Sequence, residues 1–463
     1  MKKSIIKLIA KLIFTFILII LISFSNIFTM YVKAATLPET LSPYCLLMDL
    51  DSGAILYNKN AYEKVYPAST TKIMTAIVVL EKCKLDEIVP ISHYSIFNVP
   101  IDYSNANLKE GEELTVENLL YALLIPSAND AAFALAQYVG SNGESYLCDS
   151  SATAKEQFET QTKAFYDLMN EEAKNLGCKN THFENPNGIH SENHYTTAYD
   201  LSLMGQKAMT FDIFRKIVST KTYTLPASNK YENEDRFFKN TNNLLDTSGK
   251  YYYEYANGIK TGYTEPAKHC IVCSASKDNA NLVAVVLHGE YLEDGVRQRE
   301  QDCITLFDYG FSNYTAKTIA NAGEIKKSIL VSGASFDTMH LNLVLEEDLN
   351  ALLPNDFNLA EYNPNIRLNE DIKAPISKGQ ELGTISYSIN NIDYTGKLVA
   401  ETEVLELDKV KLGIFGSLFL ILFIVIITII HRIRKRIKRK KRNNSKHSNE
   451  NDLYRTSNYY RKR

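Results

Sequence analysis

Pro67-Ala68-Ser69-Thr70-Thr71-Lys72-Ile73-Met74-Thr75-Ala76-Ile77-Val78-Val79-Leu80 is the stretch on which the fold and chemistry of this 463-residue chain depend. Its apolar side chains recur at helical spacing, which predicts one helix from Ser69 to Lys82 with its apolar face in the protein interior. Ser69 and Lys72 are three residues apart and therefore lie one turn apart on one face of that helix. A capped surface helix can carry the same tetrapeptide, but the apolar run after Lys72 favours a central, buried helix.

A serine beside a lysine in this arrangement is typical of acyl transfer. A serine hydroxyl is a poor nucleophile at neutral pH and needs a base close to its oxygen. Lys72 can be that base only when it is neutral, which requires a pKa lowered by burial and by a neighbouring cation. Lys260 is the second cation that the sequence offers. We therefore predict Ser69 as the nucleophile and Lys72 as its base.

The second motif is Ser127-Ala128-Asn129, which follows Pro126 between two helical segments. A loop in that position can project polar groups into a cleft. Ser127 would then relay a proton towards the leaving amine, and the Asn129 amide would hold the substrate backbone. The motif could equally be a helix N-terminus with Asn129 as its N-cap, and the two interpretations are compatible.

The third motif is Lys260-Thr261-Gly262, in a strand-like run from Ala256 to Tyr263. Lys260 supplies a cation and Thr261 a hydroxyl for a substrate carboxylate, and Gly262 permits close approach of a ligand. A backbone N–H just beyond the glycine can face an oxyanion. Alone, the motif could be an edge strand with a solvated lysine.

The remaining pattern predicts an α+β fold with two folded domains, over 35–314 and 315–409. Strands are concentrated at the two ends of the first domain, with helices between them, whereas the second domain is a small β-rich stalk. The polar stretch from Ser141 to Thr162 is interpreted as a surface insertion. Further helices are predicted at Ala131–Val139, Phe158–Leu176, Ala198–Met209 and Asp294–Tyr309, strands at Cys45–Tyr57 (a hairpin), Val218–Pro226, Cys270–Ser276 and Asn281–Leu287, and stalk strands at Ser328–Ser332, Leu341–Leu345, Ile372–Pro375, Leu382–Ser388 and Gly396–Val404.

Both ends of the chain point to a membrane. Residues 1–34 have the pattern of a cleaved secretory signal peptide, with an uncleaved anchor as the alternative. The run from Leu412 to Ile430 has no charged residue and predicts a transmembrane helix over 410–430. The tail 431–463, with 14 basic and 2 acidic residues from Arg432 onward, is predicted to be solvated, disordered and cytoplasmic. Because these charges directly follow a span, they indicate contact with lipid and no nucleic-acid partner.

Seven cysteines are an odd number, so at least one has no intramolecular partner. Cys270-Ile271-Val272-Cys273 resembles a redox or metal motif, but no second pair lies at zinc-ligand spacing. The surrounding run is apolar. We expect buried cysteines that pack as small hydrophobic residues in a strand.

Together with their neighbours, the three motifs resemble the Ser-x-x-Lys, Ser-x-Asn, Lys-Thr-Gly pattern of penicillin-binding proteins and serine β-lactamases. Within that class the chain resembles the D-alanyl-D-alanine carboxypeptidases, the low-molecular-mass penicillin-binding proteins of DacF type, over roughly 36–408. The supporting stretches are Met48–Gly53, Pro67-Ala68, Thr181-His182-Phe183, Asn185-Pro186, Gly188, His194–Leu201 and Asp308–Phe311.

The resemblance implies a β-lactamase/transpeptidase-like catalytic domain, an antiparallel sheet with a helical subdomain, on the extracellular face of the cell membrane. It implies release of the terminal D-alanine from the peptidoglycan stem pentapeptide through a Ser69 acyl-enzyme, with β-lactam antibiotics as covalent inhibitors. Lys72 would be the base, Ser127 and Asn129 the second-motif residues, and Lys260 and Thr261 the carboxylate binders. The backbone N–H groups of Ser69 and Tyr263 would form the oxyanion hole. No metal or organic cofactor is implied.

The chain departs from the family pattern in two places. Many relatives carry histidine where this chain has Tyr263. This difference puts the affinity for the carboxylate or the pH profile in doubt, but it does not affect an oxyanion hole that is built from backbone N–H groups. Relatives often end in an amphipathic helix lying on the membrane, whereas this chain has a span-like segment. His182 and Asp200 match the family but are expected to be structural, and Arg299 is expected to form a salt bridge.

Two alternatives remain open. A class A β-lactamase would need a glutamate that activates the deacylating water, and Glu184-Asn185-Pro186 does not have the required spacing. A catalytically silent wall-binding protein would have no use for an intact set of Ser69, Lys72, Ser127 and Lys260.

Overall fold

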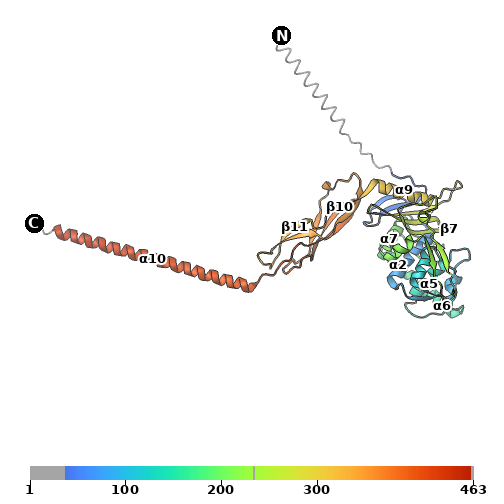
Figure 1. The fold of residues 1–463 in the computed structure, drawn as a ribbon, viewed down its shortest axis with the longest axis horizontal. Coiled ribbons are helices and arrows are strands. Elements are labelled where there is room, and N and C mark those ends of the chain that lie inside the picture. The colour runs from blue at the N-terminus through green and yellow to red at the C-terminus, as the bar shows by residue number, and fades with distance from the viewer. Residues whose placement is uncertain (1–36, 233–234, 460–463) are drawn as a thin grey trace, which may run out of the picture. The chain divides into compact units, whose positions relative to one another are not determined.

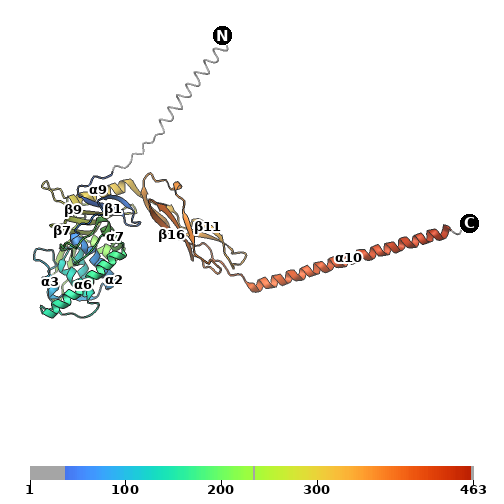
Figure 2. The same ribbon diagram turned by 180° about the vertical axis from the view of Figure 1, so that it is seen from behind.

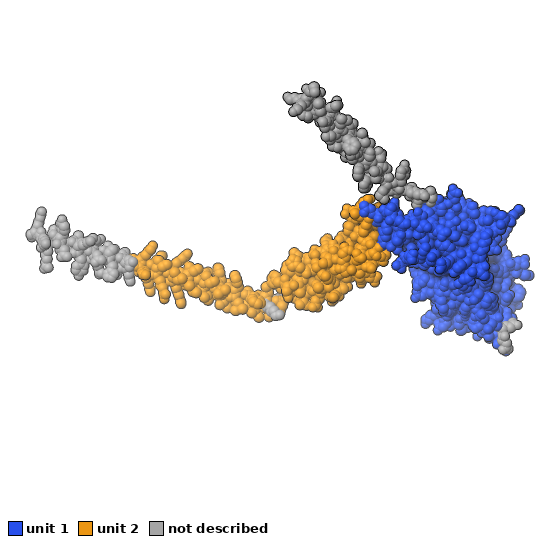
Figure 3. Space-filling model, turned by 45° about the horizontal axis from the view of Figure 1, so that its top comes forward, with its two compact units in different colours: residues 1–317, 351–358 blue, residues 318–350, 359–463 orange. Residues whose placement is uncertain are grey.

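The computed structural model describes residues 37–232 and 235–459, so the predicted signal peptide at 1–34 lies outside the described residues. The chain divides into two compact units (Figure 3). A catalytic unit contains the residues up to 317 together with 351–358, and a β-rich unit contains 318–350 and the residues from 359 onward.

The catalytic unit is built on a five-stranded sheet in the order β2-β1-β9-β8-β7 in which every neighbouring pair is antiparallel. The strands β8 and β9 are buried almost throughout because helices cover both faces of the sheet. The helix α9 packs on one face, and α7 and α8 pack on the other (Figures 1 and 2). The strands are β1 Tyr44–Asp49, β2 Ile55–Lys59, β7 Ala256–Thr264, β8 Lys268–Lys277 and β9 Ala280–Gly289.

A helical subdomain lies below the sheet and contains the stretch around Ser69 (Figure 2). The predicted helix there begins as a 3-10 turn, η1 Ala68–Thr71, and continues as α2 Lys72–Lys82. The helix α2 is buried along most of its length, as its apolar run predicts. The other helices of the unit are α3 His93–Phe97, α4 Val116–Leu124, α5 Asn129–Gly140, α6 Ala152–Asn175, α7 Ala198–Ala208, α8 Asp212–Ser219 and α9 Gln298–Asn313. Short hairpins β3 Ile88–Pro90 with β4 Glu113–Thr115 and β5 Thr222–Leu225 with β6 Arg236–Lys239, and the 3-10 turn η2 Asn243–Leu245, complete it.

Several element boundaries differ from the sequence predictions. The stretch predicted as a surface insertion up to Thr162 is helical from Ala152, because the Ser151 side chain accepts from the Ala154 N–H and caps α6. The predicted strand from Val218 starts only at Thr222. Before it, α8 buries Phe214, Ile217 and Val218 at helical spacing. The last helix begins at Gln298, four residues later than predicted, and passes through Gly310.

The β-rich unit contains a second five-stranded sheet, in the order β11-β12-β16-β15-β14. From Gly383 to Ile389, the strand β15 alternates buried with more exposed side chains, as expected for a sheet with one face in a core. The predicted strand at 372–375 forms only an isolated bridge from Lys373 to Ser332. The strands of this sheet are β11 Ile325–Leu330, β12 His340–Leu345, β14 Asn365–Leu368, β15 Glu381–Ile389 and β16 Ile392–Ala400, and a 3-10 turn η3 lies at Leu359–Glu361. The paired strands β10 Tyr314–Ala320 and β13 Leu349–Pro354 have residues in both units.

The chain ends in the helix α10, Lys409–Tyr459. Among the described residues, only the stretch Leu412–Arg442 is long and apolar enough to cross a membrane, with a mean hydropathy of 3.0 in its most apolar window. The backbone stays helical through the basic segment, so the prediction of a disordered tail is wrong for the residues up to 459. All seven cysteines are free, and Cys270 and Cys273 are buried in β8 as predicted.

Candidate active site

The Ser69 hydroxyl lies beside the Lys72 amine at the junction of η1 and α2. Lys72 Nζ is 3.0 Å from Ser69 Oγ, 2.8 Å from Asn129 Oδ1 and 2.9 Å from the Asn187 carbonyl oxygen. The first and second predicted motifs therefore meet at one nitrogen atom. The fourth group, Asn187, was not itself predicted, although its neighbours Asn185-Pro186 and Gly188 are among the stretches that match the family.

Lys72 is fully buried, and this decides its charge. Burial lowers the pKa of Lys72 well below its ordinary value, the nearby Lys260 cation lowers it further, and Asp130 partly opposes both. The two causes are those that the sequence predicted. A neutral amine beside a serine hydroxyl is the chemical state that proton abstraction requires.

Two glycines let the backbone close tightly around Ser69. A Cβ at Gly262 would lie 2.7 Å from the Ser69 backbone nitrogen, and a Cβ at Gly188 would lie 1.8 Å from the Ala68 carbonyl oxygen. Gly188 also has φ +83°, and Ala68 itself has φ +48°, which is unusual for a residue with a side chain. Ser69 is therefore held between an edge strand and a loop in a backbone conformation that its neighbours impose.

The strand β7 ends the sheet and forms the second wall of the site. Lys260 on β7 is buried, and its Nζ donates to the Thr261 carbonyl oxygen at 2.8 Å. Burial and the Arg299 cation lower the pKa of Lys260 to about 7. The Thr261 hydroxyl lies 2.6 Å from that of Thr241. The alternative interpretation of Lys260 as a solvated edge lysine is therefore wrong.

The second motif begins α5. Ser127 has φ +66°, a strained value for a serine, and is almost fully buried. The N-cap of α5 is Ala128, and no side chain caps it. The Asn129 amide instead donates to the Ser104 carbonyl oxygen at 2.8 Å and accepts from Lys72. The alternative interpretation of Asn129 as an N-cap is therefore wrong.

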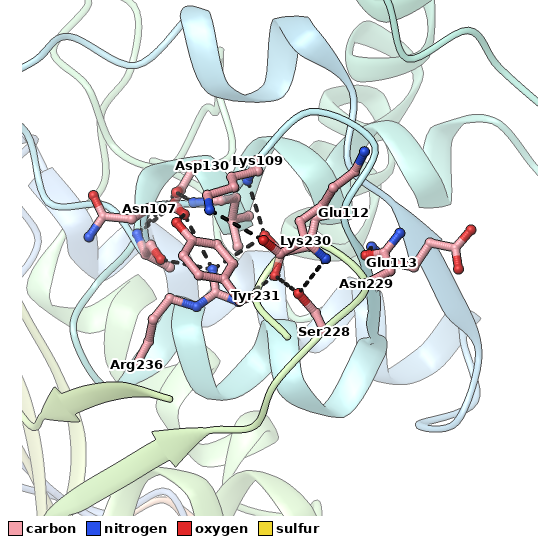
Figure 4. Close-up of polar contacts among 12 residues, drawn as sticks. Asn107, Lys109, Glu112, Glu113, Asp130, Ser228, Asn229, Lys230, Tyr231 and Arg236 are labelled. Carbon is pink, nitrogen blue, oxygen red and sulfur yellow. Dashed lines mark hydrogen bonds and ion pairs between the residues drawn. The ribbon is translucent and has the colours of Figure 1, made fainter. Parts of the chain in front are cut away.

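A buried ion pair holds the loop that carries Ser104. Arg236 on β6 pairs with Glu112, and its Nη1 also donates to the Ala106 carbonyl oxygen at 3.2 Å (Figure 4). Tyr231 donates to the Asn107 carbonyl oxygen at 2.6 Å, with the Arg236 guanidinium 4.2 Å from its ring centroid (Figure 4). At the other side, the Asp130 carboxylate accepts backbone N–H groups of residues 106 and 108. We call residues 104–112 the clamped loop.

These elements enclose a cleft of about 460 Å³. Six predicted site residues line it, while Lys72 and Lys260 lie buried behind its wall. Thr241 also lines the cleft, although no sequence motif marks it. Arg299, for which only a salt bridge was expected, does pair with Glu300 at 2.9 Å but also lines the cleft. The lining residues are Ser69, Asp102, Tyr103, Ser104, Ser127, Asn129, Thr241, Thr261, Gly262, Tyr263, Thr264, Glu265 and Arg299.

Tyr263 is half exposed at the rim of the cleft. Its hydroxyl donates to Glu265 Oε2 at 2.7 Å, and this bond to a carboxylate raises the pKa of Tyr263. Its ring lies against His269, which stacks on Tyr291 with 3.5 Å between ring centroids. The Tyr263 side chain is therefore engaged with Glu265 and His269 at the rim of the cleft.

Three other residues named from the sequence lie outside the cleft lining. Glu184 accepts from the Ser191 hydroxyl, so this glutamate is engaged within its own loop. Asp200 accepts from the Asn180 N–H at 2.9 Å, and His182 bonds to the Asn193 carbonyl oxygen at 2.7 Å. These contacts hold loops in place.

Known proteins share both units. The family model described as D-alanyl-D-alanine carboxypeptidase matches residues 31–290, and the one described as penicillin-binding protein 5, C-terminal domain, matches residues 314–411. The D-alanyl-D-alanine carboxypeptidase DacF of Bacillus subtilis is 30% identical over 373 residues, covering 79% of this chain and 85% of the relative.

Solved structures agree. The Streptomyces K15 DD-transpeptidase is 35% identical with a TM-score of 0.52, covering 60% of this chain and 99% of that one. The D-alanyl-D-alanine carboxypeptidase DacD of Francisella tularensis is 25% identical with a TM-score of 0.54, covering 81% and 97%. The predicted α+β catalytic domain followed by a β domain is therefore confirmed. Because the carboxypeptidase model matches more than half of its length, the chain belongs to the D-alanyl-D-alanine carboxypeptidase family, serine peptidases of cell-wall metabolism.

Proposed function

We propose that this protein removes the terminal D-alanine from the peptidoglycan stem pentapeptide by acyl transfer through Ser69. The observation that carries the proposal is the buried Lys72 amine, 3.0 Å from Ser69 Oγ and with a lowered pKa. In a neutral amine, two protons satisfy the oxygens of Asn129 and Asn187, and the lone pair is left for the Ser69 hydroxyl proton.

Acylation follows from that arrangement. Ser69 Oγ attacks the carbonyl carbon of the penultimate D-alanine while its proton passes to Lys72 Nζ. The oxyanion forms between the backbone N–H groups of Ser69 and Tyr263, which the small Gly262 allows to come close. The C–N bond then breaks, and the terminal D-alanine leaves as an amine after it receives a proton by way of Ser127.

Deacylation reverses the roles. Water attacks the ester carbonyl, Lys72 accepts the proton of that water, and the Ser69 oxygen recovers a proton as the ester bond breaks. The products are the shortened peptide and the free enzyme. Glu184 takes no part, because it bonds to Ser191 and does not line the cleft. Its absence from the site favours a carboxypeptidase over a class A β-lactamase.

The cationic end of the cleft supplies the specificity for a free carboxylate. Thr261 and Arg299 line this end of the cleft, Lys260 lies buried behind its wall, and Thr241 bonds to Thr261. We assign this end to the position beyond the scissile bond. A guanidinium and a hydroxyl are suited to a terminal carboxylate. Penicillin carries a carboxylate next to its strained amide, so it would acylate Ser69 and be released slowly.

The chain ends argue for an extracellular enzyme on a membrane tether. The apolar part of α10 would span the membrane, and the basic residues after it would stay on the cytoplasmic side. The catalytic unit would then lie outside the cell once the signal peptide at 1–34 is cleaved.

Transpeptidation is the second candidate, because the related Streptomyces K15 protein is described as a DD-transpeptidase. An amine acceptor would replace water in the deacylation step and leave the rest of the mechanism unchanged. One experiment separates the two. The full chain in detergent is incubated with a pentapeptide ending in D-Ala-D-Ala, with and without an acceptor amine. Free D-alanine with the shortened peptide supports the carboxypeptidase, a new amide product shows transpeptidation, and no D-alanine at all contradicts both.

A further inference from the structure

The loop between β11 and β12, residues 331–339, is tied to the segment that leads into α10. The Leu407 N–H donates to the Gly333 carbonyl oxygen at 2.8 Å, and the Ser335 N–H donates to the Leu405 carbonyl oxygen at 2.8 Å. The Leu405 N–H donates to Thr338 Oγ1 at 3.1 Å. The loop therefore stays beside the last residues before the apolar helix.

Chain geometry sets how far that loop can be from the apolar stretch. The apolar part of α10 begins at Leu412, five residues after Leu407. Two extended residues and one helical turn cover roughly 12 Å. The hydrogen-bonded step from Gly333 to Leu407 adds about 5.5 Å, so Gly333 lies within about 18 Å of the start of the stretch, whatever direction the helix takes.

The same end of the β-rich unit exposes three large apolar side chains. Phe336 at the loop tip is 73% exposed, Leu330 at the end of β11 is 64% exposed, and Leu405 is 50% exposed. Outside α10, Phe336 is the most exposed large apolar residue among the described residues of this unit. Such side chains gain free energy when they leave water.

We propose that Leu330, Phe336 and Leu405, the membrane tip, rest in the headgroup region of the bilayer that α10 enters. The inference depends on the proposed span, because the span places a bilayer within reach of the loop. The neighbouring acidic residues Glu406 and Asp408 stay hydrated and keep the tip out of the hydrocarbon core. The occupant is therefore the lipid surface, and the β-rich unit has a second contact with it besides α10.

The chain contains no tryptophan, so a single introduced tryptophan reports on one position without background. Phe336→Trp tests the tip. Ile325→Trp is the matched control, since Ile325 is 51% exposed and begins the strand that Leu330 ends. Phe419→Trp reports on the proposed span. Each full-length variant is reconstituted in phosphatidylcholine vesicles with bromine at defined depths along the acyl chains, and penicillin labelling verifies that it is folded.

For Phe336→Trp we expect the tryptophan fluorescence to lie at shorter wavelength than that of the same variant unfolded in detergent-free solution. We also expect this fluorescence to be quenched most strongly by the bromine nearest the glycerol. Ile325→Trp should show water-like emission and little quenching, and Phe419→Trp should be quenched most by deep bromine. If the fluorescence of Phe419→Trp is quenched and that of Phe336→Trp is not, the proposed membrane tip is wrong and the proposed span stands. An unquenched Phe419→Trp overturns the span and the tip with it.

Discussion

The two units differ in what they bury. The catalytic unit places Lys72, Lys260 and Asp130 in its interior, together with the Glu112–Arg236 ion pair. Among the described residues of the β-rich unit, no polar or charged side chain is buried, and its core consists of apolar residues such as Leu341, Ile385 and Leu398.

The difference shows which unit carries the chemistry. A buried charge costs several kcal/mol unless it is paired or hydrogen-bonded, so a fold that only needs stability has no reason to bury one. In the catalytic unit this cost lowers the pKa of both Lys72 and Lys260. The Lys260 cation lowers the pKa of Lys72 further, and the Arg299 cation lowers that of Lys260. The β-rich unit has no buried charge of this kind among its described residues.

The largest expected effect is on the base. Lys72→Met should lower the rate of D-alanine release by about 10⁴-fold, because Ser69 then has no group to accept its proton. Release from pentapeptide by the purified full chain measures it. Lys326→Met is the matched control in the β-rich unit, where Lys326 pairs with Glu324 at 2.8 Å, and should leave the rate unchanged. If Lys72→Met and Lys326→Met lowered the rate of D-alanine release equally, the difference in buried charge between the two units would have no bearing on catalysis.

The second effect is on stability. Arg236→Met leaves the carboxylate of Glu112 buried without its cation, which should cost about 3–5 kcal/mol. Thermal loss of penicillin labelling follows the catalytic unit alone. In the β-rich unit, Lys397→Met removes an exposed, solvent-screened pair with Glu381 and should leave the temperature at which labelling is lost unchanged. If Arg236→Met leaves the thermal stability of the catalytic unit unchanged, the clamped loop is held by its other contacts.

A smaller effect concerns the backbone at the nucleophile. Gly262→Ala places a Cβ 2.7 Å from the Ser69 nitrogen, so the walls must separate and acylation should slow by about 10²-fold. The rate of labelling by fluorescent penicillin measures this step. Gly396→Ala in β16 meets a Leu345 side chain at 2.6 Å and should affect the β-rich unit without slowing acylation. Unchanged acylation in Gly262→Ala would contradict the proposed closeness of the two walls.

The smallest effect is a shift in pH dependence. Lys260 has a pKa of about 7, so it loses its proton, and its hold on the substrate carboxylate, as the pH rises through that value. The kcat/KM profile should therefore fall on its alkaline side. Arginine stays protonated throughout this range, so Lys260→Arg should move the fall to higher pH even if the maximum rate drops. If kcat/KM falls at the same alkaline pH in the unaltered protein and in Lys260→Arg, the fall is due to the ionisation of another group.

Much of the site could be predicted because its chemistry needs particular residues at fixed spacing. Ser69 and Lys72 had to share a helix turn, and the apolar run after them indicated burial. The lowered pKa of Lys72 could also be predicted, because burial and the neighbouring Lys260 cation both disfavour its charged form.

What escaped prediction depends on tertiary contacts. Thr241 and Arg299 reach the cleft only because η2, α9 and β7 pack together, and no local pattern marks them. The side chain of Asn129 has polar partners within reach, and only the fold decides that it bonds to Lys72 and Ser104 instead of capping α5. The helix α8 was missed because it is short and adjoins a strand.

The most direct test of the buried-lysine site is the pH dependence of penicillin acylation in the full chain, with the modified residue identified by mass spectrometry of peptides. The label should be on Ser69, and the rate should rise with pH through an ionisation well below 10.5, the ordinary pKa of lysine, because Lys72 is already neutral there. A label on another residue, or a rate that rises only as the pH approaches that of an ordinary lysine, would contradict this account.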